Sequence, residues 1–169
     1  AYNSDISGIL KETTVLTPDN EVRVMKNSEL EYAYRNSFLK RNKKYIVLDA
    51  TFELQKGNVE EMKELVEERK QKRISTQPLD LPNAGSVFRN PEDDYAWRLI
   101  DICGLKGYKI GGAEVSKKHA NFIINNGNAT GKDIHDLILF VKDTVKKETG
   151  VELKIEQENN FEKIYLTSE

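Results

Sequence analysis

The chain has 169 residues, 38% hydrophobic and 32% charged, a balance typical of a globular protein with one compact domain or two small ones. No apolar run approaches the roughly 20 residues of a membrane-spanning helix. The 26 basic and 28 acidic residues are scattered and give a net charge of -2, which argues against a large cationic surface. We therefore expect neither a membrane nor a nucleic-acid partner.

Cysteine use and the start of the chain bear on location. Cys103 is the only cysteine, so we expect neither a disulfide framework nor a thiolate metal site. No secretory signal is recognisable, and the opening AYNSDISGIL lacks an initiator methionine. We expect a cytoplasmic monomer that binds no metal, and we expect the numbered chain to be a fragment.

Residues 1–57 predict mainly strands. Two β-branched runs flank the turn residues 17–20 and predict a hairpin. The segment 44–54 predicts a buried strand because it contains an Ile-Val-Leu run. Asn58 and Glu61 resemble a capping box, so a helix is expected to begin there. The apolar stripe of this helix consists of Val59, Met62, Leu65 and Val66.

A boundary follows this helix. The run 67–73 carries charges of both signs at helical spacing, which favours a solvated helix face over a nucleic-acid contact. Pro78 and Pro82 then interrupt regular structure. We therefore predict one unit over residues 1–77 and a second over residues 78–169.

The second unit predicts an α+β fold, a small sheet covered by helices. Residues 94–103 predict a short helix that Gly104 stops. The segments 108–116 and 120–127 are strand-like, and 151–156 predicts a final strand.

A longer helix is predicted from Thr130, with Asp133 at its third position, to Gly150. Its apolar face consists of Ile134, Leu137, Ile138, Val141 and Val145.

Residues 83–91, NAGSVFRNP, are too short and interrupted for a regular strand or helix. Gly85 permits a sharp turn that would direct the Ser86 hydroxyl into a cleft instead of a strand ladder. Taken alone, this pattern favours an ordinary turn serine. A catalytic triad is not indicated, because neither His119 nor His135 has a recognisable orienting partner.

Two further segments carry polar groups that periodicity does not require. In YAYRNS, residues 32–37, the planar fork of Arg35 suits a carboxylate, although a surface arginine is the commoner case. The Gly111-Gly112 pair has lysines nearby and backbone amides that suit phosphate. Its spacing matches no known phosphate loop, and a β-turn on a basic rim explains it equally well.

Five segments occur together in the order and at the separations of one family: AYNSDI, YRNS, TQPLDLPNAGSVFRNP, GLKGYKIGGAEVSKKHANFIINNGNAT and GVELKIE. Over almost its whole length the chain resembles UDP-N-acetylenolpyruvoylglucosamine reductase, also called UDP-N-acetylmuramate dehydrogenase. Members of that family have an N-terminal FAD-binding region before the part that matches residue 1. The resemblance implies the end of a flavin-binding α+β domain over residues 1–77 and a substrate-binding α+β domain over residues 78–169.

The resemblance also implies a reaction of bacterial cell-wall synthesis. NADPH reduces FAD, and the hydride then passes to the enolpyruvyl ether of UDP-N-acetylglucosamine enolpyruvate, giving UDP-N-acetylmuramate. Hydride addition leaves an enediolate, which needs a cation or acid to stabilise it and a proton donor. Because the N-terminal FAD-binding region is missing here, the chain alone is expected to be inactive.

Three catalytic roles carry over from the resemblance. Ser86 matches the proton donor, Arg35 the residue that holds the substrate carboxylate, and Glu156 the partner acid. To donate a hydrogen bond to an enediolate, Glu156 would have to be protonated. The family has Pro-Glu-Val-Arg where this chain has residues 155–158, Ile-Glu-Gln-Glu, so Glu158 is the alternative acid.

Binding residues carry over in the same way. Asn90 matches a position near the nucleotide, and Lys106 and His119 match positions that face the diphosphate. An imidazole beside phosphate is expected to hold its proton. Tyr2 and Ile46 match positions that line the flavin pocket, although a place in the core explains Ile46 equally well.

The competing interpretation is a non-catalytic α+β module that binds a nucleotide-sugar or another phosphorylated ligand. It accounts for the glycine pair and the lysines, but it gives Ser86 and Glu156 no task.

Overall fold

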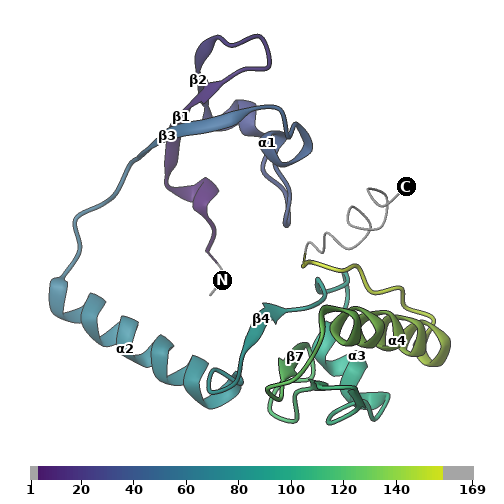
Figure 1. Cartoon of the computed structure of the whole chain (residues 1–169). Coiled ribbons are helices and arrows are strands. Elements are labelled where there is room, and N and C mark those ends of the chain that lie inside the picture. The colour runs from purple at the N-terminus through teal and green to yellow at the C-terminus, as the bar shows by residue number, and fades with distance from the viewer. Residues whose placement is uncertain (1–3, 158–169) are drawn as a thin grey trace. The chain divides into compact units, whose positions relative to one another are not determined.

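The computed structural model describes residues 4–157 and confirms the predicted α+β fold (Figure 1). The chain divides into two compact units, Ala1–Val59 and Glu60–Glu169. None of the helices in the described part of the chain combines the length and the apolar character that crossing a membrane requires. The assignment of residues 1–77 to a flavin-binding domain stays a prediction.

The first unit contains a three-stranded antiparallel sheet in the order β2-β1-β3. Its strands are β1 (Leu10–Leu16), β2 (Val22–Lys26) and β3 (Ile46–Phe52). The hairpin predicted around residues 17–20 is confirmed, because β1 and β2 pair directly. Asn20 closes the turn with a φ of 62°, a left-handed conformation that asparagine tolerates better than most residues.

Short helical turns complete this unit, namely η1 (Ile6–Gly8), η2 (Asn27–Leu30) and α1 (Phe38–Arg41). The small core gathers on the side of β1, β2 and these turns. Its buried members are Leu10, Val15, Met25 and Leu30, with Phe38, Leu39 and Tyr45 packed against them.

Strand β3 differs from its prediction. All seven of its residues are exposed, although the Ile-Val-Leu run predicted a buried strand. Among residues 4–157, β3 is an edge strand that pairs with β1 alone, and the buried residues of the unit's core do not include any residue of β3. The prediction of burial is therefore wrong, and so is the placement of Ile46 in the core, since its side chain is 58% exposed.

Helix α2 (Val59–Thr76) begins directly after Asn58, as predicted. None of its residues is buried, and the four side chains of its apolar stripe are between 42% and 66% exposed. The charged run forms exposed helical pairs such as Lys70–Glu67, which confirms the solvated face. Its last turn is attached within the second unit, because Lys118 Nζ donates to the Ile74 carbonyl at 2.6 Å.

The second unit contains a four-stranded antiparallel sheet in the order β4-β7-β6-β5. The strands are β4 (Asn83–Ser86), β5 (Lys109–Ile110), β6 (Ala113–Val115) and β7 (Phe122–Asn125). Helices α3 (Ala96–Ile102) and α4 (Gly131–Thr149) share one core with alternate residues of β6 and β7. These helices therefore cover the face of the sheet that carries Ala113, Val115 and Ile123.

Helix α4 follows its prediction closely. Thr130 and Asp133 form a complete capping box at its start, and Gly150 ends it with a φ of 75°. Four of the five predicted face residues are buried, and the fifth, Ile134, is partly buried.

Two segments of the second unit differ from prediction. Residues 83–86 form β4 immediately after Pro82, and Gly85, with a φ of +79°, lies where the pairing of β4 with β7 shifts register. Residues 151–156 form no strand but a single antiparallel bridge, Phe88↔Ile155. The reason is that β4 ends at Ser86. Residues 151–156 therefore pair with the few residues that follow β4 and not with β4 itself.

Candidate functional site

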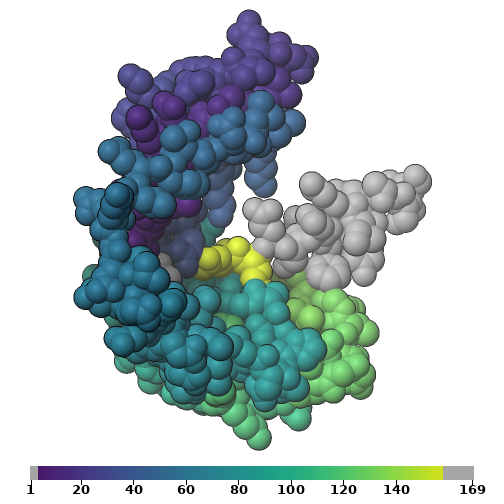
Figure 2. Space-filling model, turned by 90° about the vertical axis from the view of Figure 1, so that its left-hand side faces the viewer, coloured from purple at the N-terminus to yellow at the C-terminus, as the bar shows by residue number. Residues whose placement is uncertain are grey.

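The second unit brings the segment of Ser86 beside the segment of Glu156. Directly after β4, the Val87 carbonyl accepts the Glu156 N–H at 2.8 Å, and the Arg89 N–H donates to the Lys154 carbonyl at 2.8 Å. Figure 2 shows the last described residues, in yellow, lying against teal atoms of the same unit. Two residues predicted to be acids therefore lie on adjoining backbone segments, although they are far apart in the sequence.

Ser86 is the last residue of β4 and pairs with Phe122 of β7, so the prediction that it stays outside a strand ladder is wrong. The residue is half-buried. Its hydroxyl has no hydrogen-bond partner among residues 4–157. A hydroxyl that is positioned by its backbone and not engaged by a protein group is suited to donate to a ligand.

The backbone before Ser86 is held by side-chain amides. Asn83 Oδ1 accepts the Gly85 N–H at 3.0 Å. Gln157 Nε2 reaches back from the last segment and donates to the carbonyls of Gly85 and Ala84 at 3.1 and 3.2 Å. Gln157 thus ties the segment of Glu156 to β4 at a second point, while the alternative acid, Glu158, lies outside the described residues.

His119 lies on a turn organised by Ser116, a buried residue that no sequence pattern distinguished. Ser116 Oγ accepts the N–H groups of Lys118 and His119 at 3.2 and 3.3 Å. The imidazole ring packs edge-on against Phe122, with ring centroids 4.8 Å apart. Phe122 lies on β7 and pairs with Ser86 on β4. His119 therefore contacts the strand that pairs with the predicted proton donor.

The surroundings of His119 favour its neutral form when no ligand is bound. The expectation that the imidazole holds its proton beside phosphate stays a prediction. Burial lowers the pKa of the imidazole below its ordinary value, and the positive charge of Lys106 acts in the same direction. Nδ1 accepts the backbone N–H of Asn121 at 3.2 Å, so the neutral ring carries its proton on Nε2. The backbone N–H of Asn121 is the orienting partner of His119 that the sequence did not reveal.

The lowered pKa of His119 predicts acid sensitivity. The unfolded chain binds the proton more readily, so stability should be lost as the pH falls from about 6.5 through the lower pKa of the folded state. The variant His119→Asn does not titrate but keeps an acceptor for the Asn121 N–H. Urea unfolding at about pH 8 and about pH 5 should show a larger loss for the original chain than for this variant. Equal losses would contradict the prediction.

Lys106 and Asn90 are both exposed. Lys106 Nζ lies 2.7 Å from Asp101 Oδ2 in a partly exposed ion pair, which is weak enough for the lysine to exchange to an anionic ligand. Asn90 Oδ1 accepts the Ala96 N–H at 3.1 Å and so stabilises the start of α3. That role accounts for the carbonyl of Asn90, and its contact with a nucleotide stays a prediction.

The Gly111-Gly112 pair forms the turn between β5 and β6, as the β-turn interpretation predicted. A Cβ on Gly111 would lie 2.4 Å from Asp133 Cγ, and the Gly112 N–H lies 3.5 Å from Asp133 Oδ2. The neighbouring Lys109 pairs with the buried Glu114 at 3.1 Å. Since a carboxylate already occupies this turn, it is unsuited to phosphate.

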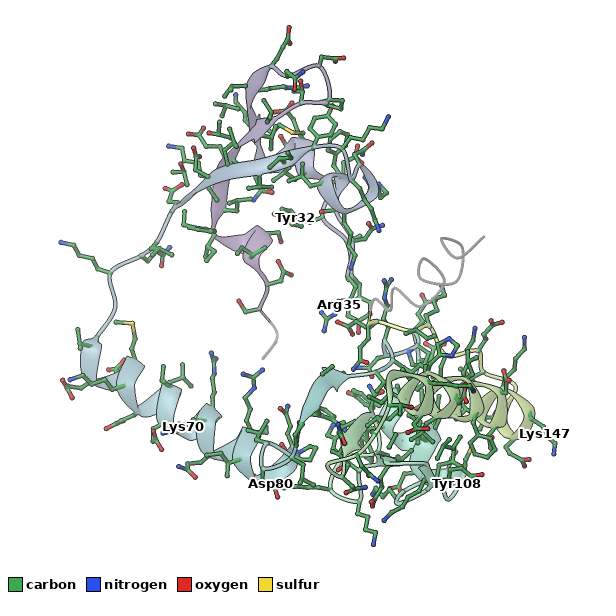
Figure 3. The ribbon with its side chains drawn as sticks, in the orientation of Figure 1. Tyr32, Arg35, Lys70, Asp80, Tyr108 and Lys147 are labelled. Carbon is green, nitrogen blue, oxygen red and sulfur yellow. The ribbon has the colours of Figure 1, made fainter. Side chains whose placement is uncertain are left out.

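Arg35 belongs to the first unit, where it sits in a two-residue turn closed by hydrogen bonds of 3.0 and 2.9 Å between Ala33 and Asn36. Its φ of 54° is left-handed, a conformation that costs energy for a residue other than glycine and is concentrated at functional sites. The guanidinium carbon lies 5.1 Å from the centre of the Tyr34 ring. Figure 3 shows Arg35 at the tip of the loop that leads from Tyr32 to α1.

Of the two residues predicted to line a flavin pocket, Ile46 begins the exposed strand β3, and Tyr2 lies outside the described residues. Within residues 4–157 no group of three or more histidine, cysteine, aspartate or glutamate side chains is arranged to hold a metal ion.

Comparison with known proteins decides the family. Residues 77–159 match the profile described as "UDP-N-acetylenolpyruvoylglucosamine reductase, C-terminal domain". The UDP-N-acetylenolpyruvoylglucosamine reductase of Caldanaerobacter subterraneus subsp. tengcongensis is 46% identical over 153 residues, covering 90% of this chain and 50% of that protein. The chain belongs to the UDP-N-acetylenolpyruvoylglucosamine reductase family.

Other members of the reductase family agree with this assignment. The protein of the same name from Anoxybacillus flavithermus is 45% identical over 158 residues, covering 94% of this chain and 52% of that protein. The crystal structure of the Thermus caldophilus reductase superposes with a TM-score of 0.75 and 32% identity, covering 90% of this chain and 53% of that chain. The chain spans about half the length of the curated relatives it matches.

Proposed function

We propose that this chain provides proton-donating and substrate-binding residues of a UDP-N-acetylenolpyruvoylglucosamine reductase of peptidoglycan synthesis. Its substrate would be UDP-N-acetylglucosamine enolpyruvate and its product UDP-N-acetylmuramate. The observation that carries the proposal is the adjoining placement of the Ser86 and Glu156 segments by the Val87 and Arg89 hydrogen bonds.

Bound FAD would supply the hydride, after its own reduction by NADPH. The exposed apolar side chain of Ile46 on β3 is accessible to such a ring and fits the predicted flavin contact. The remaining chemistry falls to residues of this chain. In the proposal, the guanidinium of Arg35 holds the substrate carboxylate with both of its parallel N–H groups, and it stabilises the charge that hydride addition pushes into that carboxylate.

Ser86 then donates its hydroxyl proton to the carbon beside the carboxylate. A serine hydroxyl is a weak acid, but an enediolate is a strong base, and the gain comes from holding the two within reach. Glu156, in its protonated form, donates a hydrogen bond to the same enediolate. Nε2–H of the neutral His119 and the ammonium of Lys106 bind the diphosphate, and Asn90 binds the nucleotide.

A chimera tests this function. Residues 1–169 are joined to the N-terminal half of the Caldanaerobacter reductase, and NADPH oxidation is followed with and without the enolpyruvyl substrate. We expect oxidation to depend on the substrate and to yield UDP-N-acetylmuramate in equal amount. Residues 1–169 alone should retain no stoichiometric flavin and show no turnover. A folded, FAD-loaded chimera that binds the UDP-sugar but never reduces it would instead favour the non-catalytic binding module.

A further inference from the structure

Asn121 connects β7 to the backbone that follows Ser86. Its side chain is buried, at 4% exposed. The Phe88 N–H donates to Asn121 Oδ1 at 2.9 Å, and Asn121 Nδ2 donates to the Phe88 carbonyl at 2.8 Å. The Val87 N–H donates to the backbone carbonyl of Asn121 at 2.9 Å. One asparagine therefore satisfies three backbone groups of two consecutive residues.

These contacts replace a strand ladder that has ended. The pairing of β4 with β7 stops at Ser86 and Phe122, so Phe88 has no strand partner on this side. A buried N–H or carbonyl without a partner costs about 1–3 kcal/mol in general. The asparagine amide is the short side chain that offers a donor and an acceptor together, and it can therefore complete both bonds of Phe88.

The same backbone also carries the contact to Glu156. On its other side, the Val87 carbonyl accepts the Glu156 N–H at 2.8 Å, and Phe88 bridges Ile155. Val87 and Phe88 thus lie between the Ser86 position and the Glu156 segment. Both side chains are buried in the core, so this dipeptide is fixed by packing and by Asn121 together.

We propose that Asn121 is a positioning residue for the reductase chemistry. It fixes the backbone of Val87 and Phe88, and through that backbone it sets the positions of the Ser86 hydroxyl and the Glu156 segment. The inference rests on the proposed function for its catalytic consequence, while its structural part concerns the Phe88 hydrogen bonds alone.

Amide hydrogen exchange of residues 1–169 tests the structural part. In Asn121→Ala the Phe88 N–H loses its acceptor, so its exchange should become faster relative to amides in α4. Unchanged protection of Phe88 in this variant would overturn the proposal, whatever the activity of the chimera.

The catalytic part is tested in the chimera with Asn121→Ala and Asn121→Asp. Displacing reacting groups by about 1 Å costs about 100-fold in rate, so substrate reduction should fall by about that factor while flavin reduction by NADPH is retained. A buried aspartate at position 121 has a raised pKa, and its protonated form again offers a donor and an acceptor. Relative to the unaltered chimera, substrate reduction by Asn121→Asp should therefore recover as the pH falls, and Asn121→Ala should not recover.

Asn42→Asp is the matched control. Asn42 Nδ2 donates to the Phe38 carbonyl at 2.8 Å, so this change removes a similar amide-to-carbonyl bond in the first unit. It should leave the ratio of the two half-reactions unchanged. Equal losses of both half-reactions in the Asn121 variants would show a merely structural role. If the unaltered chimera does not reduce the substrate, the proposed function fails, and Phe88 exchange still decides the role of Asn121.

Discussion

Replacing Ser86 with alanine is expected to slow substrate reduction by a factor of about 100 to 10,000, the usual range for losing a positioned acid. Flavin reduction by NADPH should continue at its original rate. The structure indicates that Ser86→Ala should slow the reaction without disturbing the fold. The Ser86 hydroxyl has no partner among residues 4–157, and the pairing of Ser86 with Phe122 is a backbone contact that alanine keeps. Rapid-mixing measurements of the two half-reactions in the chimera provide the check.

Ser75→Ala is the control for this change. Ser75 lies on the exposed helix α2, where its hydroxyl donates to the Lys72 carbonyl at 2.9 Å. Its loss should affect neither half-reaction. If Ser86→Ala lowered both half-reactions by the same factor, Ser86 would have a structural role, and the proton donor would have to be sought elsewhere.

Local signals predicted α4 well. Its capping box, its 3.6-residue apolar period and its final glycine all act within one or two helical turns, so they are legible without tertiary information. The hairpin of β1 and β2 follows from a local turn in the same way. Elements whose ends and faces are set by neighbouring residues were therefore predictable.

Elements that depend on distant partners were not predictable. The apolar runs of β3 and α2 predict burial, but they do not reveal whether another element packs against these segments. In this structure both runs are exposed. The segment 151–156 has strand composition, but its partner β4 ends too early to pair with it fully. A sequence pattern indicates which side chains of a segment could be buried, but the tertiary fold determines whether another element covers them.

In the candidate site, too, features that depend on distant residues could not be predicted from local sequence. Local patterns indicated Ser86 and Arg35 only as weak candidates beside an ordinary turn serine and a surface arginine. The family resemblance supplied the roles of both and was the only indication of Glu156. The lowered pKa of the His119 imidazole depends on tertiary burial, which no local pattern reveals. Asn121 acts on a backbone segment more than thirty positions away, so no local pattern could indicate its role.

Replacing Glu156 with glutamine is expected to slow substrate reduction by about 100-fold, the lower end of the range for an acid, since the amide can still donate a hydrogen bond. The Glu156 N–H bond to the Val87 carbonyl belongs to the backbone, so the segment should keep its place. Flavin reduction by NADPH should keep its original rate, and rapid-mixing measurements of the two half-reactions in the chimera provide the check.

The comparison that decides between the two candidate acids is Glu158→Gln, measured in the same chimera. If Glu156 is the acid, Glu158→Gln should keep the original rate of substrate reduction. The reason is that, among the residues described up to 157, only position 156 is tied by its own N–H to the backbone that follows Ser86. The opposite pattern, slowed substrate reduction in Glu158→Gln and an unaltered rate in Glu156→Gln, would transfer the role to Glu158. It would also mean that the bridge beside Val87 serves to anchor the chain two residues ahead of the reacting carboxyl group.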